Sequence, residues 1–549
     1  MRVAPFPAAL NPARRVALAL PLGVLMLTAC AAAPTAMREA AATGTESARD
    51  EASPAFWRRQ GEAAIAAARQ PLATGDARNV ILFVGDGMGV STVTAARILD
   101  GQLRGGSGEE NLLAFERFPR AGLSRTYNTN QQTPDSAGTM SAMITGVKTK
   151  AGVLSIDASA PRGDCAASLA ASVPTLIERA EDAGLATGVV STARITHATP
   201  AATYAHTPER DWEADSSMPP EALAAGCTDI AAQLLSFDHG DGIEVVLGGG
   251  RAMFLTRDQV DPEYAEVTGH RTDGRDLTAE WQTAHPTGHY LWNQTQFAAV
   301  PADGAPVLGL FEPSHMQFEA DRGRDPGGEP SLAEMTAFAI ERLQAQARGF
   351  VLVVEAGRID HGHHAANAYR ALTDTIALSE AVTVAQSLTS EDDTLILVTA
   401  DHSHTLTIAG YPTRGNPILG LVVGNDEHGA AEAAPTRDGF GVPYTTLAYA
   451  NGPGNQAASE QQGAGPKRLP HFPNSAVANP DGRSDLGDVD TTDPMYLQEG
   501  ISPMTAETHG GEDVPVYAQG PGAGLLGGVI EQNVVYYILE AALGESLSP

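Results

Sequence analysis

The sequence predicts an α/β fold, a three-layer sandwich in which helices flank a large, mostly parallel central sheet. Through most of the 549 residues, short apolar runs alternate with amphipathic stretches. Nearly continuous apolar runs are typical of parallel strands that are buried on both faces, with helices as the connections between them. Acidic residues directly follow several of these runs, and sheets of this class gather their functional groups at the carboxyl ends of strands.

Six apolar runs are the candidate strands of this sheet. They are NVILFVG from Asn79, ATGVVST from Ala186, IEVVLGG from Ile243, GFVLVVE from Gly349, DTLILVTA from Asp393 and VPVYAQG from Val514. The helical segments between them include VPTLIERAEDAGL from Val173 and SLAEMTAFAIERLQAQ from Ser331. A further helix is predicted from Phe56 to Gln70, where Pro54 stands just ahead of a helical pattern.

Composition divides the chain into regions. Residues 30–55 are rich in Ala, Thr, Glu and Ser without apolar periodicity, which is typical of a flexible tether, and 56–78 would form an N-terminal helical arm. We expect the main sheet domain in 79–409 and 507–549. The stretch between these, 410–506, is rich in Gly, Pro, Asn and Asp, so we expect it to form a small, irregular, crown-like insertion.

The N-terminus is typical of an export signal. Arginines precede an apolar stretch, 16–27, that is too short to span a bilayer but suits the core of a signal peptide over 1–29. The tetrapeptide LTAC ends at Cys30 and is similar to the lipobox of bacterial lipoproteins, in which this cysteine is lipidated. The resemblance implies an exported lipoprotein of the cell envelope, on the periplasmic side or the surface of the outer membrane. A plain secretory signal with an incidental cysteine is the alternative.

Charge and cysteine count limit the function further. The chain carries 35 Lys and Arg against 66 Asp and Glu, a net charge of -31, which argues against nucleic acid or an anionic membrane surface as partner. An ordinary solvated surface explains this charge. Besides Cys30, only Cys165 and Cys227 remain as a pair, which an oxidising compartment would let join.

Three predicted strands end in acidic residues, and two of these ends carry clustered histidines. A single acidic strand end would be explained by a helix cap or a turn, but three in one sheet favour a site. Carboxylates with imidazoles suit Zn²⁺, and carboxylates with hydroxyls and water suit Mg²⁺. The sequence therefore predicts a metal site among Asp86, Glu355, Asp360, His361, His363, His364, Asp401, His402 and His404.

A candidate nucleophile lies in TPDSAGTMSAMITGV. Asp135 and Ser136 follow a proline at the start of a predicted helix. A serine in this position is commonly only a helix cap. Because the same position can bind an anion through free backbone N–H groups, the structural and functional interpretations are compatible.

Seven motifs in order make the chain resemble the alkaline phosphatases, more closely the animal type than the enteric bacterial type. They are VGDGMG, PDSAGT, THATPAATYAHTPER, GLFEP, EAGRIDHGHH, VTADHSH and ETHGGEDV. The resemblance runs from about Phe56 to Glu540 and weakens between 425 and 505. It implies hydrolysis of phosphate monoesters through a covalent phosphoserine, with two Zn²⁺ and one Mg²⁺, a broad substrate range for phosphate scavenging, and a homodimer.

Matched position by position, this resemblance assigns roles to residues. Ser136 would be the nucleophile, and Arg210 would clamp two phosphate oxygens, a task that suits a planar guanidinium. The metal ligands would be Asp360, His364 and His509 for the first zinc, Asp86, Asp401, His402 and Ser136 for the second, and Asp86, Thr199 and Glu355 for magnesium. The supporting positions would be Asp135, His197, His361 and His404.

The resemblance also implies two features at the periphery. A calcium site would use Glu263, the carbonyl of Phe311, Glu312 and Glu329, with Asp325 as a rival for the last position. Cys165 and Cys227 match a disulfide of the animal enzymes. Thr199 stands where the animal type has a serine, and Ala137 replaces a glycine after the nucleophile, but a hydroxyl and a small residue are kept.

Two alternatives remain at this stage. A relative that hydrolyses phosphodiesters or sulfates would usually carry threonine or a modified cysteine as nucleophile, whereas Ser136 with Arg210 and the magnesium set favours monoesters. A lipoprotein that binds metal or phosphate without turnover would not need Ser136 and Arg210 in register with three metal sites.

Overall fold

The computed structural model describes residues 53–480 and 482–547. The expected signal peptide, Cys30 and the tether up to residue 52 lie outside the described residues. Helix α2 (Pro54–Ala68) covers most of the predicted Phe56–Gln70 helix. The described residues from 64 onward form one compact unit.

The centre of this unit is a ten-stranded sheet. In spatial order its strands are β17 (Val529–Glu531), β2 (Arg120–Arg125), β16 (Val514–Gln519), β8 (Thr394–Ala400), β1 (Asn79–Gly85), β7 (Phe350–Ala356), β3 (Ala186–Arg194), β4 (Val245–Gly249), β6 (Val307–Leu310) and β5 (His289–Leu291). Every neighbouring pair from β8 to β5 is parallel, and β16 runs antiparallel to both β8 and β2. The mostly parallel sheet predicted from the sequence is confirmed.

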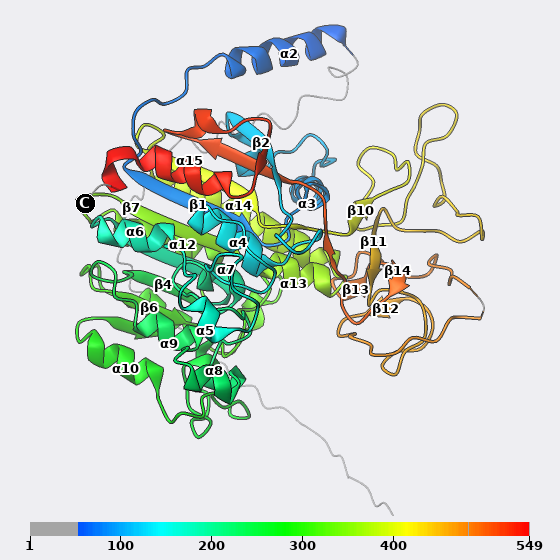
Figure 1. The fold of residues 1–549 in the computed structure, drawn as a ribbon. Coiled ribbons are helices and arrows are strands. Elements are labelled where there is room, and N and C mark those ends of the chain that lie inside the picture. Colours follow the sequence, from blue (N-terminus) through cyan, green and yellow to red (C-terminus); the bar gives the residue numbers. More distant parts are fainter. Residues whose placement is uncertain (1–52, 481, 548–549) are drawn as a thin grey trace, which may run out of the picture. The chain divides into compact units, whose positions relative to one another are not determined.

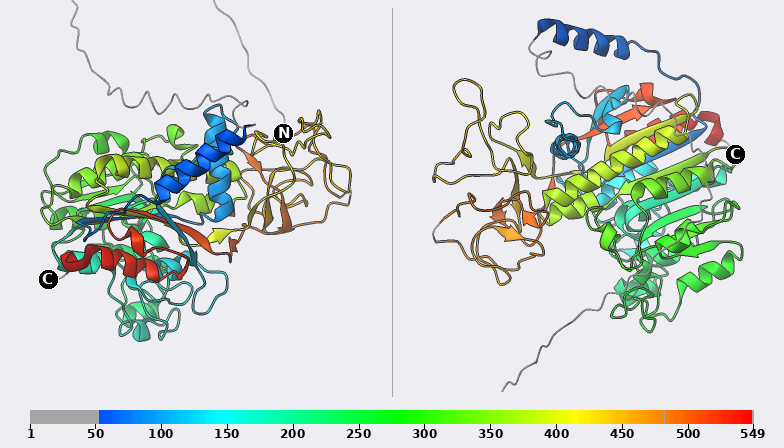
Figure 2. Two further views of the ribbon diagram at one scale, coloured as in Figure 1. Left: turned by 90° about the horizontal axis from the view of Figure 1, so that it is seen from above. Right: turned by 180° about the vertical axis from the view of Figure 1, so that it is seen from behind.

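Helices cover both faces of the sheet, as Figures 1 and 2 show. The side chains of β1 alternate between two cores, with Leu82 in one and Phe83 in the other. The first core contains residues from α4 (Ser136–Thr145), α6 (Leu176–Asp182), α9 (Ile230–Leu235), α10 (Leu277–Ala284) and α15 (Val534–Leu543). The second contains residues from α3 (Val90–Leu103), α11 (Gln294–Ala298), α12 (Leu332–Leu343) and α14 (Ala368–Leu388). The three-layer arrangement is therefore observed.

The remaining helices are short and lie close to strand ends or in connections. They are α5 (Cys165–Ser168), α7 (Ala198–Ala201), α8 (Pro220–Ala224) and α13 (Arg358–His364). Cys165 at the start of α5 forms a disulfide with Cys227, so the predicted pairing is confirmed. None of the helices in the described part of the chain has the length and apolarity needed to cross a membrane.

The segment between β8 and β16 consists mainly of loops and short strands. These strands are β9 (Ser403–His404), β10 (Leu406–Ile408), β11 (Leu447–Gly452), β12 (Lys467–Arg468), β13 (Tyr496–Leu497), β14 (Gly500–Pro503) and β15 (His509–Gly510). They pair into a three-stranded sheet, β10-β11-β14, and two two-stranded sheets. Pairing of β15 with β9 places His509 opposite His404, which returns the chain to the edge of the central sheet.

Candidate active site

The register of three neighbouring strands builds the site. Gly85 of β1 pairs with Ala356 of β7 on one side and with Ala400 of β8 on the other. Asp86 and Asp401 therefore leave the sheet side by side, and α13 starts at the same edge, just after β7. The backbone at Gly87 has a positive φ of 70°, and a Cβ there would lie 2.4 Å from the His404 ring, so glycine permits this close approach.

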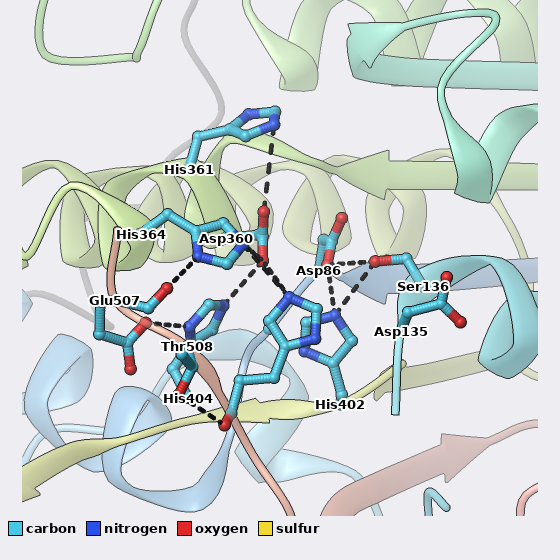
Figure 3. A network of polar contacts seen from close by, with 12 residues as sticks. Asp86, Asp135, Ser136, Asp360, His361, His364, His402, His404, Glu507 and Thr508 are labelled. Carbon is cyan, nitrogen blue, oxygen red and sulfur yellow. Dashed lines mark hydrogen bonds and ion pairs between the residues drawn. The ribbon is translucent and has the colours of Figure 1, made fainter. Parts of the chain in front are cut away.

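Ser136 is the first residue of α4 and points toward this edge (Figure 3). Its Oγ lies 3.1 Å from Nε2 of His402 and 3.4 Å from Oδ1 of Asp86. The helix cap is Asp135, which accepts a hydrogen bond from the backbone N–H of Gly138. Since Asp135 performs the capping, the hydroxyl of Ser136 is left for the site.

The second predicted zinc group is compact and buried. Nε2 of His402 lies 3.3 Å from Oδ1 of Asp86 and 3.3 Å from Oδ2 of Asp401. Burial, together with Asp401 and Asp360, raises the pKa of Asp86 well above its ordinary value. Burial likewise raises the pKa of Asp401. Two buried carboxylates beside a neutral imidazole are strongly unfavourable without a cation, which is the property expected of a metal site.

The first predicted zinc group converges on Asp360. Its Oδ1 lies 3.2 Å from Nε2 of His364 and 3.4 Å from Nε2 of His509, and these two nitrogens are 3.2 Å apart. Nδ1 of His364 faces the carbonyl of Glu507, and Nδ1 of His509 lies 2.7 Å from the carbonyl of Pro134. Each Nδ1–H donates to a carbonyl, so each Nε2 directs a lone pair toward the same point, as zinc ligands require.

His404 supports this group rather than joining it. Its Nε2 lies 2.8 Å from Oδ1 of Asp360 and its Nδ1 lies 2.5 Å from Oε2 of Glu507 (Figure 3). Burial lowers the pKa of His404, but Glu507 and Asp360 outweigh it and raise this pKa to about 10. Glu507 was not predicted from the sequence, although it begins the motif ETHGGEDV that also contains His509.

The predicted magnesium group contains polar atoms without partners. Oδ2 of Asp86, Oε1 of Glu355 and Oγ1 of Thr199 are buried, and none makes a hydrogen bond of normal geometry within the described residues. Ligand atoms of Asp86 and Glu355 lie within 4.8 Å of each other. Burial raises the pKa of Glu355 to about 7. Hard oxygen donors left unpaired in this way fit Mg²⁺.

Arg210 is held beside the nucleophile. Its Nη1 lies 3.2 Å from Oδ2 of Asp135 and its Nη2 lies 3.1 Å from Nε2 of His197. Asp135 thus caps the helix that begins with Ser136 and also fixes the guanidinium that would bind phosphate. Asp135, which precedes Ser136 in the chain, therefore brings Arg210 close to the candidate nucleophile.

The two remaining supporting histidines lie in a cluster with a third. His361 and His197 both contact His315, with ring centroids 4.0 and 5.1 Å away. His315 was not predicted from the sequence, although it stands only three residues after Glu312 in GLFEPSHM. Arg358 was also missed, and its Nη1 donates to Nδ1 of His361 at 3.0 Å.

The residues of the predicted calcium site also lie together. The hydroxyl of Tyr264 lies 3.0 Å from Glu312 and 3.2 Å from Asp325. Burial and the nearby carboxylate of Asp325 raise the pKa of Glu263. Glu263 also forms an ion pair with Arg251. Asp325 and Glu329 each retain a buried oxygen without a partner in the described chain. Asp325 and Glu329, the two candidates for the last calcium ligand, therefore both lie in this group.

A cavity of about 750 Å³ opens beside the catalytic groups. Asp135, His364 and His509 line one part of it, and residues of the irregular segment line much of the rest. The latter include Pro473, Ala476, Pro503, Met504, Thr505 and Ala506. The lining contains no lysine or arginine.

The chain is similar in sequence to known proteins. The family model for alkaline phosphatase matches residues 77–545. The tissue-nonspecific alkaline phosphatase of Gallus gallus is 43% identical over 501 residues, which cover 90% of each chain. The Homo sapiens isozyme is 42% identical over 508 residues, again 90% of each chain.

Solved bacterial structures are similar to this fold. The alkaline phosphatase of Thermus thermophilus has a TM-score of 0.59 at 25% identity, covering 86% of this chain and 93% of its own. The alkaline phosphatase of the Antarctic bacterium TAB5 has a TM-score of 0.54 at 19% identity, covering 85% and 99%. The match of the family model over most of the chain, with relatives above 40% identity, places the chain in the alkaline phosphatase family.

Proposed function

We propose that this protein hydrolyses phosphate monoesters to an alcohol and inorganic phosphate through a phosphoserine at Ser136. The observation that supports this proposal is that the candidate nucleophile, metal-ligating groups and an arginine lie in one place. The Ser136 hydroxyl at the N-terminus of α4 lies against His402 and Asp86, and Arg210 is anchored beside it on Asp135. A nucleophile, metal-ligating groups and an anion clamp in one place are what phosphoryl transfer needs.

Two zinc ions and one magnesium ion fit the donor sets. Asp360, His364 and His509 would hold the first zinc, and Asp86, Asp401 and His402 with Ser136 the second. Asp86, Thr199 and Glu355 would hold magnesium through their unpaired oxygens. When bound, these ions supply Lewis acidity that favours the serine alkoxide and stabilises charge on the entering and departing oxygens.

The chain's own groups perform the displacement. Ser136 loses its hydroxyl proton to solvent and its Oγ attacks phosphorus, the bond to the ester oxygen breaks, and the departing oxygen takes up a proton and leaves as the alcohol, which leaves a phosphoserine. Water then attacks the same phosphorus and releases Ser136 and inorganic phosphate. Arg210 holds two equatorial oxygens by paired N–H donors through both steps, and Asp135 keeps its guanidinium aligned.

The cavity supports a broad choice of alcohol. It is wide, and apart from the catalytic groups and Glu507, which is bound to His404, its lining is uncharged. The alcohol part of a substrate would therefore meet mostly small, uncharged side chains, both polar and apolar, while the phosphoryl group makes the specific contacts. This breadth suits phosphate scavenging.

The test compares turnover of a chromogenic phosphate monoester, the matching diester and the matching sulfate. We expect the monoester to be hydrolysed fastest by a large factor, because Arg210 and the metal groups would contact the charged oxygens of the phosphate. In a diester, a second ester group replaces one of these charged oxygens. Faster diester or sulfate turnover would overturn the proposal. Chelation should abolish the activity and added Zn²⁺ with Mg²⁺ should restore it, whereas hydrolysis that resists chelation would contradict the metal assignment.

We also propose that the protein is exported and anchored through a lipid on Cys30, on the periplasmic side or at the surface of the outer membrane. The lipobox-like LTAC supports this, and the Cys165–Cys227 disulfide suits an oxidising compartment. Cys30→Ser should release the protein from the membrane fraction and end incorporation of labelled fatty acid. We further propose a homodimer from the family resemblance. Sedimentation of the protein without its signal peptide and tether should then give twice the monomer mass.

A further inference from the structure

His315 completes a group of three histidines beside Arg210. It lies in the loop after β6, and its ring centroid is 4.0 Å from that of His361 and 5.1 Å from that of His197. One nitrogen of each ring lies within 4.8 Å of the other two. Spacing alone would allow a metal ion bound by three imidazoles, so the direction of the nitrogen lone pairs has to decide.

Each of these rings is faced by an arginine. Arg210 Nη2 lies 3.1 Å from Nε2 of His197, Arg358 Nη1 lies 3.0 Å from Nδ1 of His361, and Arg194 Nη1 lies 2.5 Å from Nε2 of His315. A guanidinium can only donate hydrogen bonds, so the ring nitrogens of His197 and His361 that face it must offer their lone pairs. Three guanidinium charges around the group and lone pairs directed away from its centre disfavour a cation there.

His361 is the ring that is free to act on a bound anion. Since its Nδ1 accepts from Arg358, the proton of the neutral ring is on Nε2. Oδ2 of Asp360 lies 4.0 Å from Nε2 of His361, which is beyond hydrogen-bonding distance (Figure 3). Arg358 is itself stacked on Phe318, 3.8 Å from the ring centroid. The Nε2–H of His361 is therefore available to a phosphate oxygen.

His315 cannot offer such a donor, because Arg194 occupies both edges of its ring. The backbone N–H of Arg194 lies 3.2 Å from Nδ1, and the guanidinium lies against Nε2. A neutral imidazole accepts at one nitrogen only, so one contact is the hydrogen bond and the other a close approach, and neither nitrogen is left for the site. Arg194 in turn makes two hydrogen bonds to Glu213, at 2.7 and 2.6 Å.

We propose that His315 is a positioning residue for phosphate binding. Its ring, anchored through Arg194 and Glu213, packs against His361 and holds that ring in the orientation from which Nε2–H donates to a phosphate oxygen. The inference rests on the proposed function and adds a residue outside the motifs that predicted the site. Without the packing contact, His361 would gain rotational freedom about its side-chain bonds, and the donor would be lost for part of the time.

The test measures the inhibition constant for inorganic phosphate in the metal-loaded protein, together with kcat, KM and the zinc and magnesium contents. His315→Ala should raise the inhibition constant roughly 3- to 10-fold, the weakening expected when one hydrogen bond to an anion is lost, with metal contents unchanged. His315→Gln keeps an acceptor for Arg194 but has no ring against His361, so it should weaken phosphate binding similarly. His428→Ala, at an exposed histidine, is the matched control and should change nothing.

A double-mutant cycle separates positioning from direct binding. If His315 acts through His361, then His315→Ala should have no further effect on phosphate binding in a His361→Ala protein. Effects that multiply in the double variant would overturn the proposal, as would an unchanged inhibition constant in His315→Ala or loss of metal from that variant. Wild-type hydrolysis is measured first, and its absence would overturn the proposed function itself rather than the role of His315 alone.

Discussion

Nε2 of His402 lies 3.1 Å from Oγ of Ser136, although 266 residues separate them in the chain. The two meet because α4 begins, and β8 ends, at the same edge of the central sheet. Asp86, which follows the neighbouring strand β1, lies within reach of both. The hydroxyl of Ser136 therefore lies beside two candidate metal ligands, His402 and Asp86.

Ser136→Ala should abolish turnover of a phosphate monoester, by at least about 10³-fold, because no other group can form the covalent intermediate. Zinc should remain bound, since Asp86, Asp401 and His402 still provide three ligands. The measurement is initial rate together with metal content. Ser387→Ala, at an exposed position of α14, is the matched control and should keep full activity. Substantial hydrolysis by Ser136→Ala would sink the assignment of the nucleophile.

Asp86→Asn should lower the zinc and magnesium contents together. Oδ1 of Asp86 faces His402, whereas its Oδ2 is buried without a partner in the described chain, and ligand atoms of Asp86 and Glu355 lie within 4.8 Å of each other. Loss of the charge therefore removes a ligand from both groups at once. Metal analysis of the purified variant is the measurement, with Asp182→Asn at an exposed site as control. A protein that loses only one kind of ion would contradict the bridging role.

Calcium should raise the melting temperature of the protein, and both Asp325→Asn and Glu329→Gln should reduce the rise. Each of these carboxylates has a buried oxygen without a partner in the described chain, and burial raises the pKa of Glu329 to about 9. A cation would remove the penalty for ionising such groups. Thermal unfolding with and without Ca²⁺ tests this, with Asp258→Asn as an exposed control. If only one variant lost the response, the other residue would not be a ligand.

Glu181→Gln should stabilise the protein at high pH and leave it nearly unchanged at pH 5. Burial and then Glu244 raise the pKa of Glu181 to about 8. Because this folded-state pKa lies above the unfolded value, the ionised side chain is penalised in the folded protein, and stability falls as pH rises from about 4.5 through about 8. Glutamine cannot ionise, so the variant should be more stable than the wild-type protein at pH 9 by on the order of 4 kcal/mol, and by much less at pH 5.

Urea unfolding at pH 5 and pH 9 measures this difference for Glu181. Glu391→Gln, at an exposed glutamate, should behave as the wild-type protein at both values. An equal gain at both pH values would mean that burial of the ionised group is not the cause.

Replacing both Cys165 and Cys227 by serine should lower the free energy of unfolding by about 2–4 kcal/mol, since the bridge spans 62 residues of sequence. Cys165 packs in a cluster with Trp212, Met218 and Ala222, and Trp212 is two residues after Arg210. We therefore expect KM to rise more than kcat falls. Denaturant unfolding and steady-state kinetics are the measurements. Unchanged stability would contradict a structural role for the bridge.

Local patterns predicted a large part of this fold. All six predicted strands are present as β1, β3, β4, β7, β8 and β16, because a run of apolar residues is a property of the local sequence. The strands of the central sheet that were missed, β2, β5, β6 and β17, are short or largely exposed. In β2, RAGLSR has one buried residue, so its extended form depends on pairing with β16 and β17 rather than on its own composition.

For the candidate site too, the sequence predicted some residues and the tertiary structure was needed to identify others. Motifs located Ser136, Arg210 and the candidate metal-ligating residues, and most of these residues lie at a strand end or helix start that the chain marks locally. Motifs could not identify Glu507, Arg358 or His315 as partners of His404 and His361. Which side chains meet depends on strand register and on loops that return from distant segments. Those contacts form only when the whole sheet packs, and so the tertiary structure alone decides them.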